Sequence, residues 1–156
     1  MKKVSIVFIA VIMLAACKSS DKKVDGGMSE EERRKDSLKT IENQKVMADT
    51  ANYTTIQWLD SSFKDMGKVK EGEQVKVSFR FKNTGDRPLV IANATASCGC
   101  TKPQKPEEPI APGAEGEIKA SFDSKGRKDM NRKQIYVDAN TRPSRSHELG
   151  FQVVVE

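Results

Sequence analysis

Histidine is almost absent from this chain, because His147 is the only one among 156 residues. A Ser-His-Asp triad would have to use it, yet Ser144 and Ser146 flank it without the Gly-x-Ser-x-Gly elbow that positions such a nucleophile. The sequence also lacks a phosphate-binding glycine-rich loop, a His-Glu-x-x-His pair and carboxylates clustered at metal-ligand spacing. We therefore expect neither an enzyme nor a bound cofactor. His147 itself is interpreted as an exposed residue at the start of the last strand.

Long apolar runs are missing too, since the one candidate, residues 4–16, holds only thirteen residues. A helix of that length spans about 20 Å, against about 30 Å of membrane hydrocarbon. With Lys2 and Lys3 ahead of it and small residues behind, the segment is typical of a secretory signal.

The end of this segment indicates a membrane anchor. Leu14-Ala15-Ala16-Cys17 resembles the lipobox of bacterial lipoproteins. The resemblance implies that residues 1–16 are cleaved and that Cys17 is lipidated, becomes the mature N-terminus and attaches the protein to the membrane. Several acyl chains on one residue would make that attachment effectively permanent. The alternative is a plain signal peptide with a cysteine there by chance.

The residues after Cys17 point to a location in the cell envelope. Lys18 is not the aspartate associated with retention at inner membranes, and residues 19–22 lack the acidic cluster linked to surface display. We expect a domain on the outer membrane that faces the periplasm, with surface display as the alternative.

Basic residues show no cluster of the kind that binds nucleic acid. Without Lys2 and Lys3, the 27 basic residues become 25 against 22 acidic ones, a net charge of about +3. These charges alternate in sign along the chain, whereas a phosphate-binding surface needs clustered lysine and arginine. We therefore expect no nucleic-acid partner.

Residues 17–52 have the composition of a tether behind the lipidated cysteine. Residues 18–28 are polar and contain glycine, so they bury too little surface to offset the entropy of ordering. Ser29 and Glu32 have capping-box spacing, which predicts a helix over 29–48 with one weak apolar stripe at Leu38 and Ile41. This helix is either a solvated spacer or a short amphipathic segment that docks on a partner or the domain.

From residue 53 to residue 156 the apolar residues recur with a period of two. Val75, Val77, Phe79 and Phe81 alternate with polar residues, which predicts a strand with one buried face. Shorter alternations follow, separated by turn signals, and no stretch of 10 to 15 residues has a helical period. We predict an all-β fold, an immunoglobulin-like antiparallel β-sandwich of about seven strands. Trp58 is interpreted as part of its core.

A family resemblance rests on motifs that occur in order along this region. They are Gly72-Glu73-Gln74-Val75, Phe79-Arg80-Phe81-Lys82-Asn83-Thr84-Gly85-Asp86, Pro88-Leu89-Val90-Ile91, Ser97-Cys98-Gly99-Cys100-Thr101 and Ile110-Ala111-Pro112-Gly113. Together they resemble the bacterial domain-of-unknown-function family 1573. The resemblance implies a sandwich like those of major sperm protein and cilia-associated domains, in a secreted or lipid-anchored protein with no established activity. Its turn and motif residues are Asn83, Gly85, Asp86, Gly99, Pro112 and Gly113. The chain departs from the family at residues 103–106, where the family often carries an aromatic residue.

Cys98 and Cys100 are the only cysteines left once Cys17 is lipidated. In an extended strand, residues two apart lie about 6.6 Å from each other, near the upper limit of about 6.8 Å for a disulfide. A bridge therefore needs a tight bend, which Gly99 permits. Closing so short a loop restricts the unfolded chain by only about 1.6 kcal/mol, so this bridge cannot be the staple that joins two sheets.

Four interpretations of the cysteine pair compete. The first is a local disulfide that rigidifies a loop, and the second is a thiol–disulfide exchange site. The third is a copper or zinc site, for which His147, Met66 and Met130 are candidate further ligands, although all lie far away in the sequence. The fourth is a pair of buried free thiols.

The sequence as a whole favours a lipid-anchored binding or structural module of the cell envelope. Its partners would be the membrane, through Cys17, and an envelope protein or polymer held by loops or strand edges of the sandwich. The alternative function is thiol redox chemistry or copper or zinc handling by Cys98 and Cys100.

Overall fold

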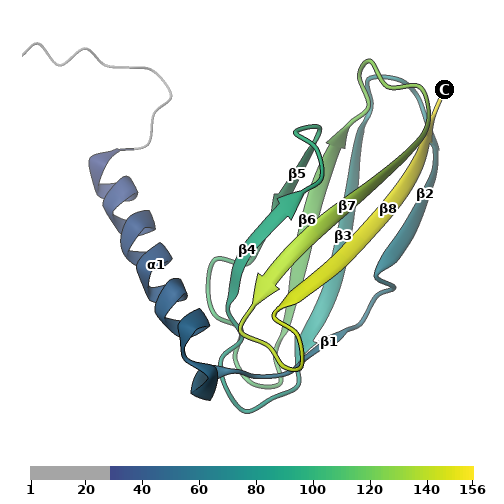
Figure 1. Cartoon of the computed structure of the whole chain (residues 1–156). Coiled ribbons are helices and arrows are strands. Elements are labelled where there is room, and N and C mark those ends of the chain that lie inside the picture. Colours follow the sequence, from purple (N-terminus) through teal and green to yellow (C-terminus); the bar gives the residue numbers. More distant parts are fainter. Residues whose placement is uncertain (1–28) are drawn as a thin grey trace, which may run out of the picture.

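The computed structural model describes residues 29–156, which form one helix beside two packed β-sheets (Figure 1). One sheet has the strand order β1-β3-β6-β5 and the other β2-β8-β7-β4. The eight strands are β1 (Ile56–Trp58), β2 (Phe63–Val69), β3 (Gln74–Asn83), β4 (Ile91–Ala96), β5 (Thr101–Gln104), β6 (Glu115–Asp123), β7 (Asp129–Ala139) and β8 (Ser146–Val155). The predicted fold class, an all-β sandwich, is confirmed. The signal at residues 1–16, Cys17 and residues 18–28 lie outside the described residues.

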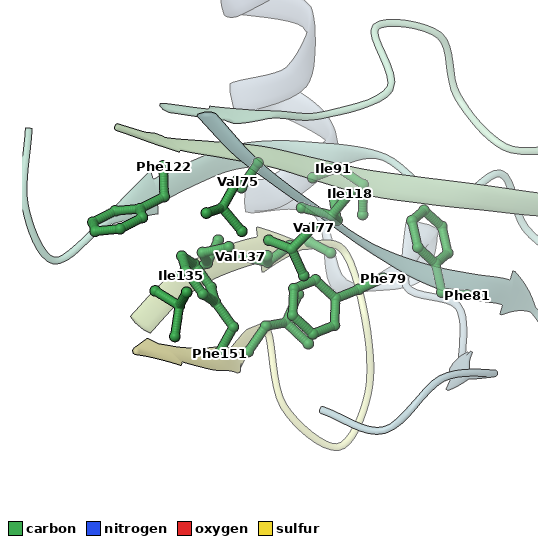
Figure 2. Packing of buried hydrophobic residues seen from close by; sticks show 14 of the residues in the cluster. Val75, Val77, Phe79, Phe81, Ile91, Ile118, Phe122, Ile135, Val137 and Phe151 are labelled. Atoms are coloured by element: carbon green, nitrogen blue, oxygen red, sulfur yellow. The ribbon is translucent and has the colours of Figure 1, made fainter. Parts of the chain in front are cut away.

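The core lies between the sheets and follows the alternation of β3. Phe79 and Phe81 are fully buried, while Arg80 between them and Lys76 earlier in the strand face solvent. In Figure 2 the β3 side chains meet Phe151 of β8 in the opposite sheet. Burying one such phenylalanine stabilises the fold by about 1.5–3 kcal/mol relative to leaving it exposed. Trp58 packs against this core from β1 and is partly buried.

Two of the eight strands carry no alternation in the sequence. β2 is mostly exposed and pairs with β8 in parallel, from Phe63 opposite Gly150 to Val69 opposite Val155. The other strand pairs within residues 29–156 are antiparallel, so the pairing of β2 with β8 departs from the expected arrangement. β5 is a short edge strand that contains Pro103, a residue that sheets tolerate at an edge.

Asn83 organises the loops at the end of β3. Its side chain is fully buried and makes four hydrogen bonds. Oδ1 accepts from the Thr54 hydroxyl at 2.8 Å and the Gly85 N–H at 3.2 Å, and Nδ2 donates to the carbonyls of Arg87 and Ile110 at 2.8 and 2.9 Å. A side chain at position 85 would collide with the Thr54 hydroxyl, which explains the glycine there. Of the turn residues predicted from the sequence, Gly85 thus bonds directly to this buried amide, whereas Gly99 lies in the cysteine turn.

A second buried amide, Asn140, joins segments far apart in the sequence. Its Oδ1 accepts from the Val90 N–H at 2.7 Å, and Nδ2 donates to the carbonyls of Asn52 and Pro88 at 2.7 and 3.0 Å. Gly113, in the neighbouring turn, has a φ of +78° and donates its N–H to the Asn83 carbonyl at 2.9 Å. These bonds fix the end of the sandwich from which the helix departs.

The helix α1 runs over Glu30–Ala48 and begins at a capping box, in which Ser29 and Glu32 bond each other's backbone N–H groups. It stands beside β4 (Figure 1). Met47, near the C-terminal end of the helix, is buried where the helix meets the sandwich. A 3-10 turn, η1 (Thr50–Asn52), then leads into the sandwich. Leu38 and Ile41 stay exposed, so the apolar stripe contacts little of the domain. No helix within residues 29–156 is long and apolar enough to cross a membrane.

Candidate functional site

The two cysteines lie on the turn that carries the chain from β4 in one sheet to β5 in the other. Cys98 and Cys100 have their sulfur atoms at disulfide distance and their Cα atoms 5.3 Å apart, so the chain bends tightly between them. Gly99 does not have a positive φ, and a side chain there would meet open space. The bend therefore does not depend on glycine.

Hydrogen bonds tie this turn to both sheets. The Ser97 N–H donates to the Gln134 carbonyl of β7 at 3.0 Å. The Asp123 N–H of β6 donates to the Cys100 carbonyl at 3.0 Å. Both cysteines are half-buried, and Cys100 packs against the core. The bridge spans only three residues, but the turn that it closes lies where the two sheets are connected.

Basic residues surround a hollow of about 440 Å³ beside Cys100. Lys102 of β5 and Lys125 and Arg127 of the β6–β7 loop line it, with Asp123 as the only acid. Oδ1 of Asp123 accepts a hydrogen bond from the backbone N–H of Lys125 at 3.0 Å, so this carboxylate already has a partner. The hollow therefore carries an excess of positive charge.

Arg127 is half-buried, and its Nε atom has no hydrogen-bond partner. Lys133 of β7 lies close enough for the two charges to interact. Burial first, and then the charge of Arg127, lower the pKa of Lys133. The Lys133 ammonium lies 5.5 Å from the centre of the Phe122 ring, which gives it some compensation.

A second hollow, of about 570 Å³, adjoins the first on the outer face of the same sheet. The two share Gln74 and Ser121, and the second adds Lys76 of β3 and Lys119 of β6. These side chains point away from the core because they alternate with buried residues along their strands. The hollows thus form one continuous polar surface.

His147 does not join the cysteines. It lies half-buried at the start of β8. Its Nε2 atom is 2.7 Å from the Thr141 hydroxyl, and its ring centre is 5.8 Å from that of Trp58. The expectation that it is exposed is wrong, because it points inward under Trp58. Burial lowers its pKa, partly opposed by Asp138.

The register of β7 separates His147 from the cysteine turn. His147 faces Val137 on that strand, whereas Ser97, next to Cys98, bonds to Gln134. Three residues along a strand are about 10 Å.

The two methionines proposed as metal ligands lie elsewhere. Met66 packs against the core, and Met130 is exposed at the start of β7. Within residues 29–156, no three His, Cys, Asp or Glu side chains come together in a way that could hold a metal ion.

A third surface is a groove of about 920 Å³ between α1 and the sandwich, lined by both polar and apolar residues. Lys39 and Asn43 of the helix line it, opposite Ala92 and Asn93 of β4. The Lys39 ammonium lies 2.8 Å from a carboxylate oxygen of Glu108, in the loop after β5. This contact holds the middle of the helix beside the groove.

Asp60, just after β1, lies at the centre of a charged network that no sequence motif indicates. Its carboxylate accepts from Lys64 of β2 at 2.9 Å and from the backbone and side chain of Arg80 of β3 at 3.0 to 3.3 Å. These bonds hold the pKa of Asp60 well below its usual range, with the Lys64 hydrogen bond as the largest cause. The network links an edge strand of one sheet to the other sheet.

The family described as protein of unknown function (DUF1573) matches residues 56–155. The chain belongs to this family. The match covers the sandwich from β1 to β8, and α1 lies outside it. The DUF1573 domain therefore contains the cysteine turn, both hollows and the Asn83 loops.

Solved structures share the fold. A protein of unknown function from Porphyromonas gingivalis W83 aligns with a TM-score of 0.58 and 17% identity, over 68% of this chain and 49% of that one. The chain thus spans about half the length of that protein. The secreted serine protease VesC of Vibrio cholerae gives a TM-score of 0.49 at 12% identity, over 74% of this chain and 24% of that one. A PapD-like domain of human CEP192 gives 0.47 at 12%, over 67% and 86%. A comparison with curated proteins finds no match.

Proposed function

We propose that this protein is a lipid-anchored binding module of the cell envelope, in which Cys17 holds the DUF1573 sandwich to the membrane. The observation that carries the binding role is the open edge of β4 beside the α1 groove. The lipobox-like run at residues 14–17 supports the anchor. As a helix of 19 residues, α1 is about 28 Å long and serves as a spacer.

The β4 edge offers backbone groups to a partner strand. Among the described strands β4 pairs with β7 alone. In an antiparallel pair, the backbone N–H and C=O groups of successive residues point alternately toward the partner strand and away from it. The Ser97 N–H donates to β7, so the N–H groups of Ala94 and Ala96 point to the open side. The Ala94 N–H donates to Oδ1 of the neighbouring Asn93 side chain at 2.9 Å, so a local bond stands where a partner strand could accept. An extended segment of an envelope protein would displace that local bond and add to the sheet.

Photo-crosslinking in intact cells tests this role. A photoreactive residue in place of the exposed Asn93 is expected to give a defined protein adduct, and one in place of the exposed Met130 is not. Ala94→Pro removes the outward N–H while an edge strand tolerates the proline, so it should abolish the Asn93 adduct in a folded protein. Equal adducts at both positions, or an adduct that survives Ala94→Pro, would contradict strand addition at β4.

A second candidate function is thiol–disulfide exchange, favoured by the cations Lys102, Lys125 and Arg127 around Cys100. A thiolate of an incoming dithiol would attack the Cys98 sulfur, breaking the disulfide so that Cys100 leaves as a thiolate beside these cations. The second thiol of the dithiol would then displace Cys98, and the two electrons would pass to the cysteine pair. Nearby cations favour the thiolate and hence the reduced form. For the copper or zinc alternative, no third His, Cys, Asp or Glu side chain within residues 29–156 joins the two cysteines in a group that could hold a metal ion.

Equilibration with defined ratios of reduced and oxidised dithiothreitol tests the exchange role. Replacing Lys125 and Arg127 together by glutamine should make the Cys98–Cys100 pair harder to reduce. A pair that is reduced at the same ratio in wild type and variant would show that the cations do not act on the thiolate.

A further inference from the structure

The outer face of β3, β6 and β5 carries a set of basic residues that the β4 edge does not use. We call it the basic face and define it by Lys76, Lys102 and Lys119 of the strands and by Lys125 and Arg127 of the adjacent β6–β7 loop. These residues line the two adjoining hollows together with the neutral Gln74. The face lies on the sheet β1-β3-β6-β5, whereas β4 belongs to the other sheet. The two surfaces can therefore be tested separately.

Most of the positive charge on the basic face has no acidic partner. Lys119 pairs with Glu117 at 3.1 Å. Within residues 29–156, no carboxylate lies within ion-pair distance of Lys76, Lys102, Lys125 or Arg127. An anion bound here would not have to displace an existing ion pair.

Arg127 provides the strongest sign of a missing anion. Its Nε atom is buried without a hydrogen-bond partner, although a buried polar group normally has one. A second cation, Lys133, lies close by, and its lowered pKa reflects burial and the charge of Arg127. A planar guanidinium whose Nε–H has no partner can donate to an oxygen of a carboxylate or phosphate.

The shape and composition of the face restrict the ligand further. The two hollows run together over three strands, which suits an extended chain better than a single small ion. The outward residues of β3, β5 and β6 include no aromatic side chain, so sugar rings cannot stack there and recognition depends on charge and hydrogen bonds.

We propose that the basic face binds an extended anionic polysaccharide, held through its carboxylate or phosphate groups, with Arg127 and Lys125 as the main contacts. Binding of this polymer needs neither the membrane anchor nor the β4 edge. It would give the module a second, polymeric ligand besides a protein strand.

Calorimetric titration of the purified full-length protein with three probes tests the proposal. The probes are hexagalacturonate, its fully methyl-esterified form, and linear polyphosphate. We expect the protein to bind hexagalacturonate, polyphosphate or both, with an affinity that falls as salt rises, and not to bind the neutral ester. The stronger of the two anions identifies a carboxylate or a phosphate source. Absence of binding to both anions, or equal binding of the ester, overturns the proposal.

Matched variants locate the site. Lys125→Gln with Arg127→Gln should weaken binding at least about tenfold, equivalent to about 1.4 kcal/mol. The control Arg34→Gln with Lys45→Gln removes the same charge from exposed positions on α1 and should leave affinity unchanged. Equal losses in both pairs would show a general charge effect and overturn the assignment.

Folding of the variants is checked by thermal unfolding. If the double variant on the basic face unfolds, Lys102→Gln at an exposed position replaces it. That variant should bind the anions at least about threefold more weakly, and an unchanged affinity counts against the proposal. Neither result depends on the crosslink at Asn93, so failure of this inference and failure of the binding role at β4 are distinguishable.

Discussion

Asn83→Ala tests the account of how the loops at the end of β3 are held. The substitution removes four hydrogen bonds from a fully buried side chain. The Thr54 hydroxyl, itself buried, loses its acceptor, while the carbonyls of Arg87 and Ile110 are only part-buried and can regain water. Each buried group left without a partner costs about 1–3 kcal/mol. With the buried Thr54 hydroxyl left unpaired, three part-buried bonds exchanged for water and a small cavity left behind, the expected loss is about 3 kcal/mol.

Urea denaturation at neutral pH measures this loss. A domain of this size has a free energy of unfolding of about 5–15 kcal/mol and an m-value of about 1–1.5 kcal/mol per molar urea. The midpoint of Asn83→Ala should therefore fall by about 2 M with an unchanged m-value. Asn93→Ala is the control, because Asn93 is exposed and bonds only to its neighbour, so it should cost less than about 0.5 kcal/mol.

Asn83→Asp separates the amide's two roles. An aspartate keeps an acceptor for Thr54 but turns a second oxygen toward two carbonyls that need a donor. It should destabilise the protein at least as much as alanine does. A loss below about 1 kcal/mol for Asn83→Ala, or one equal to that of Asn93→Ala, would show that the Asn83 side chain does not hold these loops.

Three further predictions concern other parts of the sandwich. Gly85→Ala should cost about 2 kcal/mol in urea unfolding, because its methyl group would overlap the Thr54 hydroxyl, and a neutral effect would show that the loop yields easily. Asp60 has a lowered pKa in the folded protein, so its contacts stabilise the fold above the unfolded pKa of about 3.9 and lose that effect as the pH falls below it. The difference in free energy of unfolding between wild type and Asp60→Asn should therefore be constant from about pH 5 to 8 and shrink below about pH 4. A difference that does not depend on pH would contradict this role of Asp60. Replacing Cys98 and Cys100 by serine should lower the free energy of unfolding by no more than about 1.6 kcal/mol, and a larger loss would mean that the bridge does more than close its short loop.

The sequence predicts the strands that bury alternate side chains and misses those that do not. β3 shows its period of two in Val75 to Phe81, and the sheet buries that face as expected. β2 forms because it can pair in parallel with β8, although most of its side chains are exposed. Its existence depends on a neighbour more than 80 residues away, which no local pattern reveals.

The same limit applies to the candidate sites. The spacing of Cys98 and Cys100 indicates a local pair, because their separation is fixed by two peptide units. The basic face combines Lys76, Lys102 and Arg127 from three separate segments, so only the strand order β3-β6-β5 brings them together. His147 looks like an exposed polar residue among Arg145 and Glu148, and only the packing of β1 against β8 shows that Trp58 covers it.

Mass spectrometry of the native N-terminus tests whether this DUF1573 domain is a lipid-anchored module. The protein is extracted from the membranes of its own cells, and its N-terminal peptide is isolated and weighed. We predict that the chain begins at Cys17 and that this residue carries several acyl chains. A chain that begins elsewhere, or an unmodified Cys17, would contradict the account.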